Sequence, residues 1–225
     1  MDEKLTQLRL LVTMLLLVTA MAMPKMAWAE ITPTKPSSGD GSSANPYQIS
    51  TAGELYWFAA LVNGKLTDGT ALNTSANAVL VNDITVNTGV LTADGKLASD
   101  VSGFRVWTPI GKNNIYKIYE GTFDGQGHTV RGLYFNNSNT ACVGLFGFIG
   151  SGAKISNVGV VDSYFNGYYY VGGVCGYNKS GTISNCYHIG VVKGKDDKVG
   201  GVCGNNVSES STSTIKFIKW LYTVF

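Results

Sequence analysis

The chain has 225 residues, of which 14% are charged, and its formal net charge is +2. This length suits one ordinary domain or one array of short repeats. So small a charge, with no cluster of Lys or Arg, argues against nucleic acid or an anionic membrane surface as a partner. The 28 glycines and 5 prolines, with many Val, Ile, Tyr and Thr residues, favour strands and tight corners over helices.

Residues 1–29 have the features of a secretory signal peptide. Lys4 and Arg9 precede an apolar run, and Ala27-Trp28-Ala29 provides the small residues of a cleavage site. We therefore predict an exported chain that is cleaved after Ala29 and is secreted or held at the cell surface. The alternative is an uncleaved anchor, but the apolar run is shorter than the ~20 residues that span a bilayer. No integral membrane span is expected after cleavage.

The first element expected in the mature chain is a helix from Thr51 to Asn63. Thr51 and Glu54 have the spacing of a capping box, and apolar residues recur at helical spacing from Leu55 to Val62. A stack of strands needs its open first turn covered, because a bare edge invites aggregation. We predict that this helix is the cover.

Short runs of β-branched and aromatic residues follow the helix and predict strands. These runs are Ala78–Asn82, Ile84–Val86, Phe104–Trp107, Ile115–Tyr119 and the two halves of Phe123–Phe135 around a glycine turn. The polar stretch Gly89–Gly103 is expected to be a loop. We interpret the runs as the irregular first turns of a solenoid.

Residues 142–206 repeat themselves at a step of 28 residues. Val171-Gly-Gly-Val-Cys-Gly176 returns as Val199–Gly204, and Ile155-Ser-Asn157 returns as Ile183–Asn185. A fixed period of this size is typical of a solenoid, whose repeats bury their apolar faces only against their neighbours. Because each copy contains three short apolar runs, we predict an all-β, right-handed parallel β-helix with one N-terminal capping α-helix.

Two residue types are expected to shape the repeat. Asn157 and Asn185 should lie one above the other, so that their side-chain amides bond along the stack. The repeated glycines are expected to form the corners of the coils: Gly144, Gly147, Gly173, Gly176, Gly201 and Gly204.

The four cysteines occupy apolar positions and show no metal or redox spacing. In the alignment of the copies, Cys175 and Cys203 match Phe146, Cys186 matches Val158, and Cys142 matches Val171 and Val199. Buried free thiols are therefore expected. The alternative is a disulfide between Cys175 and Cys203 on adjacent turns, because the chain is predicted to be exported.

Several of these motifs together resemble a known family. Gly144-Leu-Phe-Gly147, with its later copies and the Ile-Ser-Asn elements, is similar to the GLUG-motif repeat of proteins exported by gut Bacteroidetes. Trp107–Gly111, Gly121–Leu133 and Pro46–Leu55 resemble what commonly precedes such repeats. The resemblance covers roughly residues 45–206. It implies a β-helical, non-catalytic surface module, often beside adhesive or peptidase domains.

The chain departs from this pattern after Asn206, where an apolar tail replaces the next Ile-Ser-Asn element. We interpret the tail as the mark of a truncated longer protein. A last strand that closes the stack and an aggregation-prone edge are the alternatives. The expected organisation is a signal peptide at 1–29, a flexible linker at 30–45, a cap with irregular first turns at 46–135, GLUG repeats at 136–206 and a divergent apolar tail at 207–225.

No motif predicts catalysis, a cofactor or a metal site. Asp124-Gly-Gln-Gly-His128 precedes a strand and is interpreted as a glycine turn rather than a phosphate loop. His128 and His188 lack partners at metal-ligand spacing and are expected in solvent or on a strand face. The charged residues that a β-helix enzyme would gather on one face do not recur at the repeat period: Asp124, Arg131, Asp162, Asp196 and Asp197.

The densest aromatic stretch is the candidate ligand-binding surface: Tyr164, Phe165, Tyr168, Tyr169 and Tyr170. Its equivalent in the next copy, Val192–Lys198, is polar, so some rings should face outward, where tyrosine commonly serves recognition. Packing rings or a solvated strand are the alternative. We predict a structural or adhesive module that binds a glycan or a host or bacterial protein without catalysis. The competing class is a glycan-processing β-helix enzyme or a detached accessory fragment of a surface peptidase.

Overall fold

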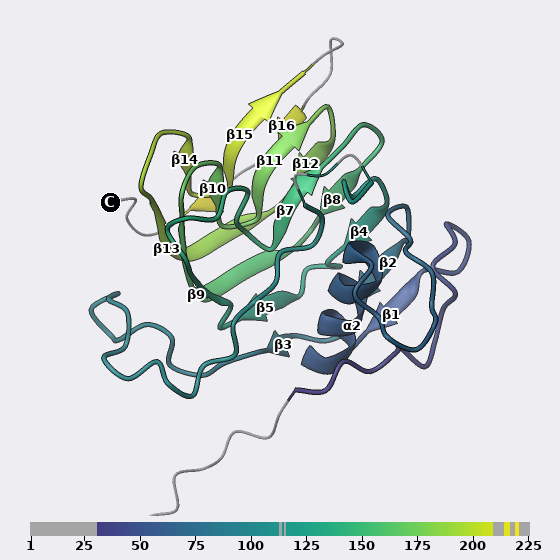
Figure 1. Ribbon diagram of the computed structural model, residues 1–225, viewed down its shortest axis with the longest axis horizontal. Helices are drawn as coiled ribbons and strands as arrows, with labels where there is room; N and C mark the ends of the chain where they lie inside the picture. Colours follow the sequence, from purple (N-terminus) through teal and green to yellow (C-terminus); the bar gives the residue numbers. More distant parts are fainter. Residues whose placement is uncertain (1–30, 113, 115, 209–213, 217–218, 221–225) are drawn as a thin grey trace, which may run out of the picture. The chain divides into compact units, whose positions relative to one another are not determined.

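Parallel strands stack into a β-solenoid of about 5 turns with one short helix (Figure 1). This computed structural model describes residues 31–112, 114, 116–208, 214–216 and 219–220. The predicted all-β solenoid with one helix is confirmed. The predicted signal peptide and its cleavage site lie outside the described residues, as do most residues of the 207–225 tail.

Successive turns add strands to the same four sheets. The first sheet contains β1 (Tyr47–Ile49), β2 (Ala78–Leu80), β4 (Thr122–Asp124), β8 (Lys154–Ser156), β12 (Thr182–Ser184) and β16 (Thr214–Lys216). The second contains β3 (Ile84–Thr85), β5 (Thr129–Arg131), β9 (Gly159–Gly167), β13 (Tyr187–Gly194) and β17 (Lys219–Trp220), with β6 (Tyr134–Asn136) also paired to β9. The third contains β7 (Phe146–Ile149), β11 (Cys175–Lys179) and β15 (Cys203–Val207), and the fourth contains β10 (Val171–Gly172) and β14 (Val199–Gly200).

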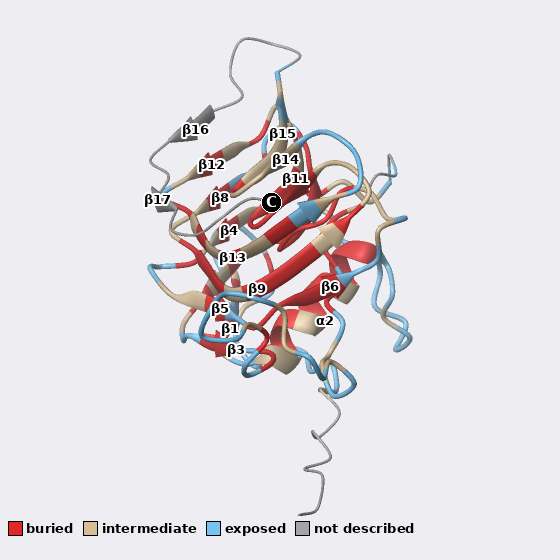
Figure 2. Cartoon of the chain, turned by 90° about the vertical axis from the view of Figure 1, so that its left-hand side faces the viewer, coloured by how far each residue is buried: buried red, intermediate tan, exposed pale blue. Residues whose placement is uncertain are grey.

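The core is a set of columns, because in-register parallel pairing places the same face of each strand over its predecessor. In the first sheet Phe123 pairs with Ile155, which pairs with Ile183, and all three side chains are buried. The long strand β9 is buried almost throughout (Figure 2). One face of β9 meets the interior, and Tyr164 on its other face belongs to a second apolar cluster that the 88–104 loop completes with Val90.

Helix α2 (Ala52–Asn63) confirms the predicted helix and its signals. Thr51 is the N-cap, its hydroxyl accepts from the Glu54 backbone N–H at 3.2 Å, and Gly64 ends the helix at φ 59°. The ring of Phe58 packs against Tyr119 and Phe123, with centroids 6.1 and 6.0 Å apart. The buried side of α2 therefore packs on the aromatic core of the early turns, as the expected cover requires.

Two predicted strands are wrong, and for Phe104–Trp107 the reason lies in its hydrogen bonds. In Phe104–Trp107 only Val106 forms a bridge, with Tyr134, and in the described part of Ile115–Tyr119 only Tyr119 does, with Ile149. The side chain of Asn87 accepts from the Arg105 N–H at 2.7 Å and donates to the Arg105 carbonyl at 3.0 Å. A side chain thus satisfies backbone groups that a neighbouring strand would otherwise bond.

The predicted linker contacts the folded chain at several points. The Thr34 N–H donates to the Gly53 carbonyl at 3.1 Å, and the Gln48 N–H donates to the Ser38 carbonyl at 3.0 Å. The Ser42 N–H donates to the Asp40 side chain at 2.8 Å within a local turn. These bonds tie residues 34–42 to the beginning of α2 and to β1.

The repeat glycines fall into two groups, so the expectation that all six form corners is corrected. The first of each copy lies in a bend (Gly144, Gly173 and Gly201), and the second lies in a strand (Gly147, Gly176 and Gly204). None of the six has a positive φ. A Cβ on Gly147 would lie 2.5 Å from the Gly111 carbonyl oxygen, and one on Gly176 would lie 2.6 Å from the Tyr170 carbonyl oxygen. Close backbone approach therefore explains the strand glycines.

Left-handed backbone occurs instead at non-glycine corners. Cys142, Tyr170 and Lys198 precede the same fourth-sheet position in three successive turns, with φ of 60°, 57° and 65°. Val143, not Cys142, pairs with Val171. The expected match of Cys142 to Val171 is therefore wrong by one residue. The segment from Val143 to Phe146 is one residue shorter than the segment from Val171 to Cys175 with which it pairs. The matches of Cys175 to Phe146 and to Cys203 are confirmed by the strand register.

Candidate ligand-binding surface

Three of the predicted tyrosines form a half-exposed row at the turn after β9. Tyr168 packs edge-on against Tyr169 with centroids 5.0 Å apart, and Tyr169 packs against Tyr170 at 4.6 Å. Tyr170 contacts Tyr177 of β11 at 4.8 Å, and Tyr177 stacks on Phe148 at 4.5 Å. We call Tyr168, Tyr169, Tyr170 and Tyr177 the tyrosine surface. Its rings pack on one another and still keep part of their area in solvent.

The other two predicted aromatic residues are not available to a ligand, which corrects that part of the prediction. Phe165 is fully buried because its ring points into the solenoid, where it faces the imidazole of His188 at 6.0 Å. Tyr164 is 6% exposed, because its ring stacks on Tyr134 under the 88–104 loop. Adjacent strand residues point to opposite faces, and here both faces of β9 are covered.

Lysines from the following turn lie over the aromatic rings. The amine of Lys198 is 5.1 Å from the centroid of Tyr170, and that of Lys195 is 5.8 Å from the centroid of Tyr168. Both lysines are exposed. The polar stretch Val192–Lys198 therefore covers part of the tyrosine surface and adds positive charge beside it.

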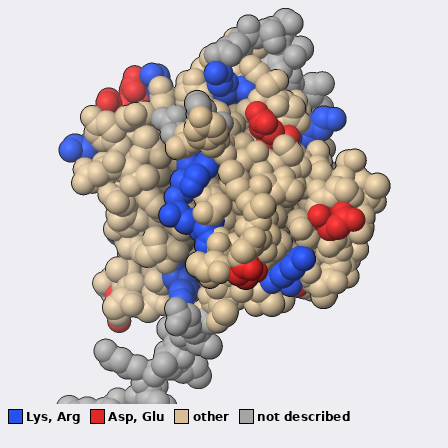
Figure 3. Space-filling model, turned by 45° about the vertical axis from the view of Figure 1, so that its right-hand side comes forward, with Lys and Arg blue, Asp and Glu red and all other residues tan. Residues whose placement is uncertain are grey.

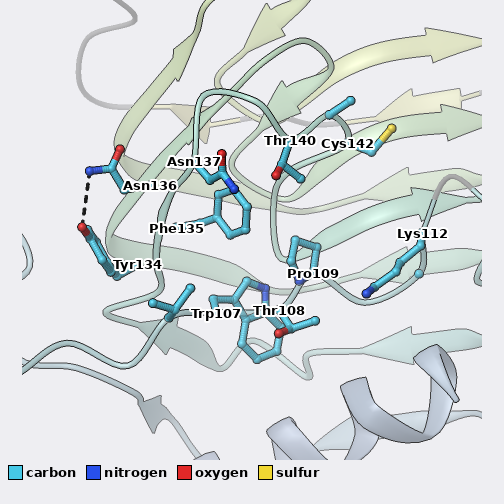
Figure 4. Close-up of a pocket in the computed structure, with 13 residues that line it drawn as sticks. Trp107, Thr108, Pro109, Lys112, Tyr134, Phe135, Asn136, Asn137, Thr140 and Cys142 are labelled. Carbon is cyan, nitrogen blue, oxygen red and sulfur yellow. Dashed lines mark hydrogen bonds between the residues drawn. The ribbon is translucent and has the colours of Figure 1, made fainter. Parts of the chain in front are cut away.

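A cavity of about 460 Å³ opens on the preceding turn, and sequence reasoning did not predict it. We call it the Trp107 pocket. Figure 4 shows Trp107, Thr108 and Pro109 on one side of the cavity, Asn137 and Thr140 on the other, and Lys112 extending its amine toward Pro109. Val106 at its edge is 59% exposed, whereas Trp107 is fully buried beneath the surface.

Helix α2 and the repeats together hold the wall that contains Trp107. The indole N–H of Trp107 donates to the Gly144 carbonyl at 3.1 Å. From the helix, the Tyr56 hydroxyl donates to the Val106 carbonyl at 3.2 Å, and the Asn63 amide donates to the Pro109 carbonyl at 2.9 Å. The wall is thus fixed at three points although it contains no strand.

The Trp107 pocket and the tyrosine surface share the corner at residues 140–142. The Tyr168 N–H donates to the Thr140 carbonyl at 2.7 Å, and the Cys142 N–H donates to the Tyr169 carbonyl at 3.1 Å. Thr140 and Cys142 both line the pocket. Consequently the two features lie on adjacent turns of the solenoid and could meet one extended ligand.

The charge at the pocket is positive. Burial, and then the nearby charges of Lys65 and Lys117, lower the pKa of Lys112. The Lys112 N–H donates to the Lys117 carbonyl at 2.8 Å, which brings the backbones of these two residues together. On the face drawn in Figure 3, Lys and Arg side chains gather in a row with acidic side chains around it.

The titratable residues considered for catalysis have structural partners. Asp124 accepts from the Asn157 amide at 2.9 Å, and Asp162 accepts from the Leu91 N–H at 3.0 Å. His128 lies 3.4 Å from Asp83. His188 does lie on a strand, but it is 4% exposed rather than solvated, and burial lowers its pKa to about 4. Across the ranges that the structure covers, no group of three His, Cys, Asp or Glu residues is placed to hold a metal ion.

All four cysteines are free thiols in this structure. Cys142, Cys175 and Cys186 are buried, and Cys203 is half-buried. Burial raises the pKa of Cys142 to about 12 and that of Cys186 to about 11. These two thiols are therefore poor nucleophiles at neutral pH.

The chain is similar to small parts of two larger curated proteins. No family model matches it. It is 28% identical over 166 residues to Halomucin of Haloquadratum walsbyi, covering 74% of this chain and 2% of that protein. It is 30% identical over 128 residues to a "Putative Gly-rich membrane protein" of Evansella cellulosilytica, covering 57% of this chain and 12% of that protein. The chain therefore spans a small part of the curated relatives that it matches.

Among solved structures, the chain resembles a "putative immunoglobulin A1 protease" from Bacteroides ovatus. The TM-score is 0.56 at 19% sequence identity, covering 82% of this chain and 50% of that one. The likeness supports the β-solenoid fold. No helix within the described ranges is long and apolar enough to cross a membrane.

Proposed function

We propose that the chain is an exported, non-catalytic binding module of the cell surface, built from GLUG-type repeats, and that it binds a glycan. The observation that carries this proposal is the half-exposed row of Tyr168, Tyr169 and Tyr170, with Lys195 and Lys198 over two of its rings. Tyrosine offers a large, rigid and amphipathic contact area at low entropic cost. Sugars present apolar C–H faces to such rings and hydroxyls to the phenol groups and lysines around them.

The rigid placement of the row supports a recognition role. Backbone bonds from Tyr168 and Cys142 fix the row against the preceding turn, and the Asp196 N–H donates to the Tyr168 carbonyl at 2.9 Å from the following one. A preformed surface loses little conformational entropy when a ligand binds. The curated relative named as a membrane protein is compatible with a place at the cell surface.

The experiment is a glycan array probed with the full chain and with a variant in which Tyr168, Tyr169 and Tyr170 are changed to Ala. We expect the wild type to bind a defined set of glycans and the variant to lose them while its β-type circular dichroism is kept. Absence of glycan binding by the folded wild type would refute the proposal.

A second candidate is an accessory segment of a surface peptidase. The fold likeness to half of the Bacteroides ovatus chain favours it. On this alternative the tyrosine surface would contact a protein substrate or a neighbouring domain. Binding of the full chain to immunoglobulin A, with no binding on the glycan array, would support this second candidate over the first.

A further inference from the structure

The Trp107 pocket combines features that point to a ligand class. We propose that it binds the negatively charged group of an acidic sugar, with Lys112 as the direct partner and Lys65 and Lys117 strengthening the attraction. This inference rests on the proposed glycan binding and names the class of glycan. It concerns a cavity that is separate from the tyrosine surface and one turn away from it.

The size and lining of the cavity suit a sugar ring. Its volume of about 460 Å³ lies within the range of small-ligand sites. Val106 gives it an exposed apolar edge, and Phe135, 9% exposed, gives it a mostly buried apolar wall. An apolar wall beside polar groups matches a sugar, which has C–H faces and a ring of hydroxyls.

Polar groups in the wall retain bonding capacity. Asn137 accepts the Asn139 N–H at 3.0 Å through its side-chain oxygen, and among the described residues its amide N–H₂ has no protein partner. The hydroxyls of Thr108 and Thr140 likewise form no hydrogen bond within the described part of the chain. Figure 4 shows the three side chains on opposite sides of one space. They can serve the donor and acceptor needs of sugar hydroxyls.

Lys112 explains why the sugar should be acidic. Its side chain is half-buried beside two further lysines, and none of the three forms an ion pair within the described ranges. Desolvation and like charge both disfavour the ammonium form, as the lowered pKa of Lys112 reflects. An anionic group placed in the pocket would relieve this repulsion and form a charge-assisted hydrogen bond.

A long polyanion is a poorer match than an acidic sugar. The whole chain has a net charge of only +2, which is too small for the electrostatic footprint of a nucleic-acid partner. Three lysines instead lie near one cavity whose volume suits a small ligand. The pocket therefore suits one charged ring within a glycan better than a long polyanion.

The test uses the full chain and glycans that carry galacturonate, sialate or sulfated galactose, each with a neutral counterpart of the same backbone. Isothermal titration with wild type should show tighter binding of at least one acidic form than of its neutral counterpart. Lys112→Gln should weaken the acidic form roughly tenfold to a hundredfold, the loss expected for a charge-assisted hydrogen bond. Lys112→Arg should restore most of the affinity. Lys154→Gln, on an exposed position of β8, is the matched control and should change nothing.

The outcomes separate this inference from the proposed function. Equal affinity for acidic and neutral forms, with loss in the Tyr168→Ala, Tyr169→Ala, Tyr170→Ala variant, overturns the acidic-sugar pocket and leaves glycan binding intact. Preference for acidic forms that depends on Lys112 but not on the tyrosines supports the pocket and overturns the tyrosine surface as the main site. Carboxylated and sulfated ligands, compared separately, identify the charged group. No binding of any acidic form overturns the pocket proposal.

Discussion

The side-chain amide of Asn185 donates a hydrogen bond to the side-chain oxygen of Asn157, 3.0 Å away on the turn below. Asn157 in turn donates to Asp124 at 2.9 Å, so the column crosses three turns. Both asparagines have left-handed backbone, with φ of 54° and 52°. Asparagine tolerates this conformation better than most residues, and its amide can bond along the stack. One residue type therefore both turns the corner and ties adjacent turns together.

Replacing Asn185 should separate these two roles. Asn185→Ala removes the hydrogen bond. It also leaves a left-handed residue whose side chain cannot form the local hydrogen bonds by which asparagine tolerates this conformation. We therefore expect a destabilisation of about 2 kcal/mol. Asn185→Gly keeps the backbone conformation accessible and should cost about 1 kcal/mol. Urea unfolding of both variants measures the difference. Equal losses would mean that backbone conformation contributes nothing at this corner.

The glycines at 173 and 201 occupy the same repeat position but differ in their surroundings. A Cβ on Gly173 would lie 2.1 Å from Cγ of His188, whereas one on Gly201 would meet no described heavy atom within 4 Å. We expect Gly173→Ala to destabilise the chain by about 3 kcal/mol through overpacking. Gly201→Ala should change stability by no more than about 0.5 kcal/mol. Thermal unfolding of the pair tests this, and similar losses in both would contradict the packing argument.

A double variant tests whether the imidazole causes the clash. In the presence of His188→Ala, the added methyl of Gly173→Ala should cost clearly less than it does in the wild type. The coupling comes from the double-mutant cycle of unfolding free energies. Additive losses would place the strain on the neighbouring backbone instead of on His188.

The buried imidazole of His188 should make stability depend on pH. Burial lowers its pKa from 6.5 to about 4 in the folded chain. Between these values the unfolded state binds a proton that the folded state does not, so stability falls as pH falls from about 6.5 to about 4. The total is about 3 kcal/mol. Unfolding free energies measured across this range should fall less steeply for His188→Leu, while His128→Leu should keep most of the wild-type slope. An unchanged slope in His188→Leu would contradict the assignment.

The cap of α2 should matter for the stability of the early turns. Thr51→Ala removes the acceptor for the Glu54 N–H and should cost about 1 kcal/mol. Thr51→Ser retains the hydroxyl and is expected to lie close to the wild type. Denaturant midpoints compare the two, and an Ala variant as stable as the Ser variant would show that the capping box contributes little.

The fold was predictable wherever residues recur or obey local rules. The 28-residue step set the strand register, and the Thr51–Glu54 spacing set the start of α2. Prediction failed at Phe104–Trp107, because Asn87, a residue distant in sequence, bonds the Arg105 backbone in place of a strand. It failed at Cys142 because the segment from Val143 to Phe146 is one residue shorter than its counterpart in the next copy. An alignment at a fixed period cannot detect such a deletion.

The candidate site was predictable only in part. The tyrosines at 168–170 stood out because the next copy is polar, but burial of Tyr164 depends on the 88–104 loop, whose packing has no local signal. The Trp107 pocket was not predictable from the sequence, because its lining comes from three separated segments, 106–112, 134–137 and 140–142. The sequence does place Lys112 and Lys117 close together. Two lysines at such a spacing are typical of an ordinary solvated surface, so they did not indicate a pocket.

The most direct test of the proposed function compares two triple variants on a glycan bound by the wild type. Changing Tyr168, Tyr169 and Tyr170 to Phe keeps the rings, and changing them to Leu keeps apolar bulk without them. Stacking is worth roughly 1 kcal/mol for each ring. Isothermal titration should therefore show the Phe variant within about tenfold of the wild type and the Leu variant at least about a hundredfold weaker. Equal affinity of the Leu variant and the wild type would contradict ligand binding at the tyrosine surface.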